Sequence, residues 1–160
     1  MLVHRREHFA DLFAACYVGP VIIDTLYAIN PNAEISLTHP STEKRLDTIQ
    51  AFLDGDEFDE LEMYQGALNS LGLPTLQQRY TMPSLETAFD DIRPYVISND
   101  QELHGMFPGG WSYLGKIKSG GGPVWASGGG QLDAVRIVND LTEKSIRNAS
   151  IRDLWKGGAA

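Results

Sequence analysis

The chain has 160 residues, 42% of them hydrophobic, which suits one globular domain with a sizeable core. A net charge of −8 with scattered lysines and arginines excludes tight nucleic-acid binding as the main task, because phosphate contacts need clustered cations. The single cysteine excludes an internal disulfide and fits a reducing compartment. The N-terminal sequence is typical of neither a signal peptide nor a membrane span.

The first half of the chain predicts helices separated by glycine and proline. Apolar residues recur at helical spacing from about Val3 to Val18, and Gly19-Pro20 supplies a stop. Val21 to Ile29 is apolar and short, so its pattern does not separate a helix from a buried strand. A further helix is expected from about Ser41 until Asp54-Gly55 ends it.

The helix after Asp56 has the clearest pattern in the chain. Asp56 is expected to cap it, and Gly72 and Pro74 close it. Apolar residues recur three or four positions apart, which keeps them on one side of a helix. This stripe consists of Phe58, Leu61, Tyr64, Leu68 and Leu71. We therefore expect Leu61, Leu68 and Leu71 to lie in the core.

Two more helices are expected after Pro83. Ser84 can cap the first, which would point Leu85, Phe89 and Ile92 inward. Asn99 has the spacing of a capping box and predicts a short helix leading to a glycine-broken aromatic turn centred on Trp111. Phe89 and Trp111 are expected core residues.

The last forty residues begin with a change in composition. Glycine triplets bracket Pro123 to Ser127, which predicts a flexible loop or arm. Leu132 to Val138 fits a strand by its β-branched residues and a helix by its spacing, and both remain open. Ser150 can cap a final short helix carrying Ile151, Leu154 and Trp155.

These elements predict a mainly α fold. It is a helical bundle with a Gly-rich loop or arm and, as the open alternative above, a small β element. The expected domain organisation is a helical domain over residues 1–118, a Gly-rich flexible loop over 119–131 and a C-terminal strand or helix arm over 132–160.

One short motif has the form of a catalytic site. His4, Glu7 and His8 match H-x-x-E-H, in which two imidazoles one helical turn apart bind zinc and a glutamate activates water. A zinc peptidase is therefore one alternative, although a solvated polar first turn explains the same residues. No other metal, cofactor or nucleophile motif occurs in the sequence, so we expect no enzyme, cofactor or metal.

A second motif is acidic. Six acids crowd the nine residues from Asp54 to Glu62, and their spacing fails the calcium-loop pattern in both registers tested. A solvated face that favours the positive end of the following helix is the expected role.

The segment from Leu61 to Pro74, taken with Leu103 to Tyr113, resembles the head-to-tail adaptor proteins of tailed bacteriophages, such as podophage tail tubular protein A. The resemblance rests on an Ala-Leu and Leu-Gly helix core, a helical tyrosine and a Pro-Trp turn. The corresponding residues are Ala67-Leu68, Leu71-Gly72, Ala88, Tyr95, Leu103, Pro108, Trp111 and Tyr113.

The resemblance implies a virion protein without catalysis, assembled in the host cytoplasm. Such adaptors form a ring, suspected to be a dodecamer, that docks on the portal protein, receives tail or nozzle proteins and passes DNA without tight binding. Trp125, Ile151, Leu154 and Trp155 would then contact portal or tail. Asp54, Asp56, Asp59 and Glu62 would face the channel, where their charge would repel DNA.

A further alternative is a small acidic inhibitor or immunity protein that binds a basic partner. The negative charge suits that role through electrostatic complementarity. No membrane partner is expected.

Overall fold

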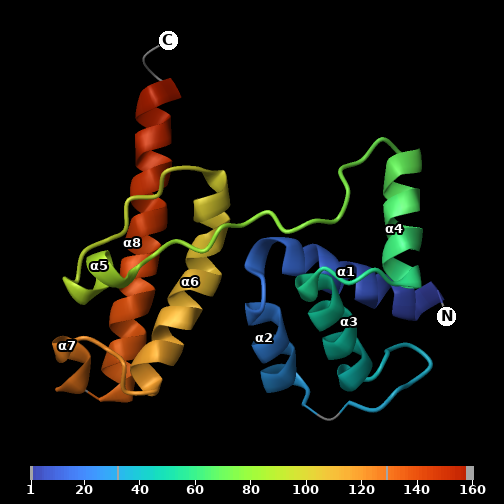
Figure 1. Ribbon diagram of the computed structural model, residues 1–160, viewed down its shortest axis with the longest axis horizontal. Helices are drawn as coiled ribbons and strands as arrows, with labels where there is room; N and C mark the ends of the chain where they lie inside the picture. Colours follow the sequence, from blue (N-terminus) through green and yellow to red (C-terminus); the bar gives the residue numbers. More distant parts are fainter. Residues whose placement is uncertain (1, 32, 129, 158–160) are drawn as a thin grey trace. The chain divides into compact units, whose positions relative to one another are not determined.

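A computed structural model describes residues 2–31, 33–128 and 130–157, and this part of the chain is mainly helical, with eight helices and no strand (Figure 1). The helices are α1 (Leu2–Val18), α2 (Val21–Ile29), α3 (Thr42–Asp54), α4 (Asp59–Ser70), α5 (Glu86–Asp90), α6 (Asp100–Lys118), α7 (Val124–Ser127) and α8 (Gln131–Gly157). None of these helices is long and apolar enough to span a membrane.

The chain divides after Arg79 into two compact units, unit 1 (residues 1–79) and unit 2 (residues 80–160). The sequence placed its first boundary at residue 118 instead. The difference arises because α6 packs against α8, so residues on both sides of the Gly-rich segment share one core.

Unit 1 is built on three helices in mutual contact, α1, α2 and α3. Gly19 turns the chain between α1 and α2 with φ of 56°, a left-handed conformation that glycine adopts without steric penalty. The Ser41 hydroxyl caps α3 by accepting from Lys44 N at 3.2 Å, and Gly55 ends the helix with φ of 82°. The core contains Leu12, Ala15, Cys16, Ile49, Phe52, Tyr64 and Leu76.

The fourth helix of unit 1, α4, is present as predicted, but its predicted cap is wrong. α4 starts at Asp59, and Phe58 occupies the N-cap position without a side-chain hydrogen bond, so Asp56 is not the cap. Tyr64 connects α4 to α1. Its side chain is buried, and its hydroxyl donates to Arg5 O on α1 at 2.8 Å.

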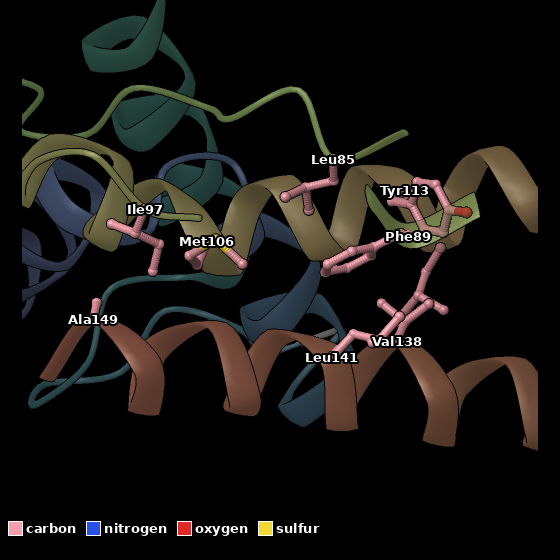
Figure 2. Packing of buried hydrophobic residues seen from close by; sticks show 9 residues of the cluster. Leu85, Phe89, Ile97, Met106, Tyr113, Val138, Leu141 and Ala149 are labelled. Atoms are coloured by element: carbon pink, nitrogen blue, oxygen red, sulfur yellow. The ribbon is translucent and has the colours of Figure 1, made fainter. Parts of the chain in front are cut away.

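Unit 2 is centred on α6 and α8, which run antiparallel (Figure 1). Their facing sides and the short α5 enclose a continuous apolar cluster, in which Phe89 and Met106 are fully buried (Figure 2). Phe89 and Tyr113 meet edge to face, with ring centroids 5.4 Å apart. The Tyr113 hydroxyl donates to Asp90 Oδ1 at 2.6 Å.

Helix α6 continues through Pro108-Gly109-Gly110, so the predicted turn at Trp111 is wrong. At Gly105 and Gly110, α6 packs too closely for a side chain. A Cβ on Gly105 would lie 1.9 Å from the Thr81 carbonyl oxygen, and one on Gly110 would lie 3.0 Å from Thr142 Oγ1 on α8. The start of α6 follows its expected cap, since Asn99 Oδ1 accepts from Glu102 N at 2.9 Å.

The Gly-rich loop and the small β element are not confirmed. Part of the segment after Ser119 forms α7, and Leu132 to Val138 lie inside α8. The helical alternative holds because Ala134, Val138 and Leu141 are buried at helical spacing.

Helix α5 is shorter than expected. Leu85 and Phe89 are buried as predicted, whereas Ile92 lies beyond the helix, half exposed, with φ of 53°. A left-handed conformation is unusual for a β-branched residue. Here Arg93 N donates to Ala88 O at 2.9 Å, which closes the helix end around Ile92.

Candidate functional site

An apolar groove lies on unit 1, lined by Phe9, Phe13, Cys16, Tyr17, Leu68, Leu73, Pro74, Thr75, Leu76 and Arg79. One wall is an aromatic ladder on α1, made by rings at positions i, i+4 and i+8. The Phe9 and Phe13 rings stack with centroids 6.4 Å apart, and the Phe13 and Tyr17 centroids are 5.3 Å apart. Phe9 also meets Tyr64 edge to face at 5.5 Å.

The opposite wall is the extended segment from Leu73 to Arg79. The Gln65 side chain of α4 holds it with two hydrogen bonds, since its Nε2 donates to Leu76 O at 2.7 Å and its Oε1 accepts from Leu76 N at 3.1 Å. Arg79 N donates to Cys16 O on α1 at 2.7 Å. The segment is therefore tied to both helices.

The groove has a cavity of about 290 Å³ and an apolar rim. Phe13 and Leu73, one from each wall, are each about half exposed, at 51% and 50%. Cys16 lies at the bottom and is 1% exposed, and burial raises the pKa of its thiol. Cys16 therefore acts as a small buried apolar side chain here, as expected from its helical face.

The structure does not assemble His4, Glu7 and His8 into a zinc site. His4 Nε2 lies 2.8 Å from Ser36 O, while Glu7 Oε1 lies 2.7 Å from His39 Nδ1. His8 is buried, and burial, followed by the charge of Lys44, lowers its pKa. Among the residues that the structure describes, no group of three or more His, Cys, Asp or Glu side chains could hold a metal ion.

The four acids predicted to face a channel lie near the junction of α3 and α4. Asp54, Asp56, Asp59 and Glu62 are all exposed. Asp59 and Glu62 occupy the first turn of α4, where negative charge favours the helix dipole. Their orientation toward a channel remains a prediction.

The five predicted core residues divide into three groups. Phe89 is fully buried, as expected. Leu61 and Leu68 are half-buried and pack against the core of unit 1. The prediction is wrong for Leu71 and Trp111, which are 71% and 48% exposed. Leu71 lies one residue past α4, and Trp111 stands on the outer side of α6 with the Lys118 ammonium 5.8 Å from its ring centroid.

The four predicted interface residues do not share one surface. Trp125 is half-buried against the core of unit 2, and its indole Nε1 donates to Phe89 O at 3.2 Å and to Asp90 O at 3.1 Å. Ile151, Leu154 and Trp155 are exposed on the last turns of α8. We call these three residues the α8 end.

The α8 end follows the last point at which α8 packs into unit 2. Ala149 is buried in the core cluster, and the Arg152 guanidinium donates to Ile97 O. Leu154 and Trp155 are three and four residues after Ile151, which places all three on one side of the helix. The α8 end thus presents apolar side chains to solvent, with Trp155 79% exposed.

Sequence reasoning missed the groove. Its aromatic ladder was visible as Phe9, Phe13 and Tyr17, but the same spacing predicts an ordinary core face. The rest of the lining comes from α4 and from an extended segment whose position depends on the Gln65 clamp.

Comparisons of the chain with protein-family models, with curated proteins and with solved structures give no match.

Proposed function

We propose that the chain is a structural assembly protein that forms the head-to-tail adaptor ring of a tailed bacteriophage virion. In this role, copies of the chain dock on the portal protein, connect the capsid to tail or nozzle proteins and surround the DNA channel. The proposal keeps the function implied by the resemblance of Leu61 to Pro74 and Leu103 to Tyr113.

The observation that carries the proposal is the α8 end. Scattered exposed apolar residues are normal on a protein surface, but three within about one helical turn, including a tryptophan, are typical of an interface anchor. Unit 2 leaves these side chains uncovered. An assembly partner would remove them from water.

The charge of the chain supports the same role. The net charge of −8 repeated around a ring would keep DNA from adhering to the channel. The exposed acids Asp54, Asp56, Asp59 and Glu62 are the candidates for the channel surface, since they are closely spaced and solvated.

Co-sedimentation with the portal protein encoded in the same genome tests the proposal. The wild-type chain should sediment with portal rings, and Leu154→Asp should reduce the bound amount at least tenfold, because it places a charge on an apolar surface that assembly of the ring would bury. Val124→Asp changes an exposed apolar residue of α7, away from the α8 end, and should bind like the wild type. A wild-type chain that stays in the supernatant at every concentration would contradict the proposal.

A further inference from the structure

We propose that the groove of unit 1 binds the α8 end of a second copy of the chain, so that copies associate head to tail. The inference rests on the proposed function and narrows it. It makes the next copy of the chain, instead of the portal, the direct partner of Ile151, Leu154 and Trp155.

The groove has the size and lining for one large apolar anchor. Its volume of about 290 Å³ is larger than the cavity of about 150 Å³ that holds a benzene ring in an engineered protein core. Its wall of Phe9, Phe13 and Tyr17 offers ring faces and edges to an entering indole. Trp155 is the α8 side chain that matches this lining.

The lengths of the two surfaces also agree. Phe9 and Tyr17 are eight residues apart, so the ladder extends about 12 Å along α1. Ile151 and Trp155 are four residues apart, or about 6 Å along α8. The whole apolar turn therefore fits beside the ladder, in the way that amphipathic helices occupy apolar grooves.

The overall charge of the two regions favours this partner. Unit 1 has 12 Asp and Glu against 5 Lys and Arg, a net charge of −7, although Arg79 is the charged residue in the groove lining. The last fourteen residues of α8, 144–157, carry four cationic residues and one acid, a net charge of +3. Opposite net charges speed the encounter of two surfaces. A second copy supplies both an apolar anchor and a basic segment opposite in charge to unit 1.

The two surfaces are different, so the contact is heterologous. A heterologous contact leaves one free groove and one free α8 end on every pair of copies, and it propagates to a closed ring when the rotation between neighbours closes. Head-to-tail association of this kind is how a chain with two separate complementary surfaces builds the ring of the proposed function.

Light scattering of two defective variants tests the proposal. Phe13→Asp places a charge in the groove and leaves the α8 end unchanged. Trp155→Asp places a charge on the α8 end and leaves the groove unchanged. At about 100 μM, above the micromolar dissociation constants of weak specific interfaces, the wild type should form assemblies and each variant alone should have the monomer mass of 17.7 kDa.

Mixing the two variants gives the decisive result. One intact α8 end then meets one intact groove, so an equimolar mixture should form a species of twice the monomer mass and stop there. An unfolded variant could not complement the other, so this outcome excludes misfolding as the cause of the monomers. Val124→Asp, on α7, is the control and should assemble like the wild type.

Three results would overturn the inference: a wild-type chain that is monomeric at that concentration, single variants that still assemble, or a mixture that keeps the monomer mass. Portal co-sedimentation shows whether only the head-to-tail contact is wrong or whether the proposed adaptor function is wrong as well. A monomeric wild type that joins the portal overturns only the head-to-tail contact, whereas assembly without portal binding supports the contact and contradicts the adaptor role.

Discussion

At the scale of single residues, a two-point ion pair between Asp11 and Arg45 joins α1 to α3. Arg45 Nε and Nη2 donate to the two Asp11 carboxylate oxygens at 2.8 and 2.7 Å, and Asp11 is 5% exposed. The carboxylate raises the pKa of Arg45. Arg45 also pairs with Glu7 at 3.2 Å, whereas the buried Asp11 depends on Arg45 to balance its charge.

Arg45→Leu should destabilise the chain by about 3 kcal/mol, because it leaves the Asp11 carboxylate buried without a cation. Urea unfolding followed by circular dichroism measures this loss. Arg93→Leu is the matched control, since it breaks an exposed pair with Asp91 and should change stability by less than about 1 kcal/mol. Equal effects for the two variants would contradict the importance of burial.

His8 should make unit 1 sensitive to mild acid. Burial, and secondarily Lys44, lowers its pKa from the usual 6.5, and its Nδ1 has no hydrogen-bond partner. The unfolded chain takes up a proton on His8 as pH falls below about 6.5, while the folded chain does not. The stability that neutral His8 contributes is therefore present above that pH and is lost as pH falls toward the folded-state pKa.

The comparison that isolates this effect is urea unfolding at pH 7 and pH 5.5 for the wild type and for His8→Phe, which keeps a ring but cannot titrate. The variant should lose less stability between the two pH values. A variant that loses as much as the wild type would show that other groups account for the pH dependence.

At the scale of elements, α6 shows two different roles for glycine on one helix. Gly105 lies against the backbone of the segment that precedes α5, where a Cβ would collide with the Thr81 carbonyl. Gly115 has nothing within 4 Å of its Cβ position. Its replacement affects only helix propensity.

Gly105→Ala should therefore destabilise unit 2 by at least about 2 kcal/mol, because the backbone contact must shift. Gly115→Ala should stabilise it by up to about 1 kcal/mol through helix propensity. Thermal unfolding of the two variants and of the wild type shows whether each substitution raises or lowers the stability. Destabilisation of the same size in both would contradict the assigned packing.

The elements were predictable where local chemistry decides them. The stop at Gly19-Pro20, the helix start around Ser41, the end at Gly55 and the Asn99 cap all appear in the sequence and in the structure. Pro108-Gly109-Gly110 misled the prediction because this pattern usually breaks a helix. In α6 the glycines face Pro83, Leu85 and Thr142, and these tertiary neighbours are not visible in local sequence.

At the scale of the whole molecule, each unit has its own apolar core. The segments 1–79 and 80–160 should each fold when expressed alone, since a domain with its own core can fold independently. Circular dichroism should give helical spectra for both fragments, with a cooperative thermal transition for each. A fragment without a cooperative transition would show that its core depends on the rest of the chain.

The sequence predicted the mainly α class and a helix carrying Ile151, Leu154 and Trp155, but not the groove. That helix is not the separate short one expected after Ser150, because α8 continues through Ser150. The groove brings together positions from Phe9 to Arg79, and no local pattern encodes a surface made from two helices and an extended segment.

Copies of this chain are proposed to form a ring on a phage portal. The decisive measurement is electron microscopy of portal rings incubated with the purified wild-type chain. Portals should then carry an additional ring of density on one face. Unchanged portals beside free 17.7 kDa chains would rule out the ring.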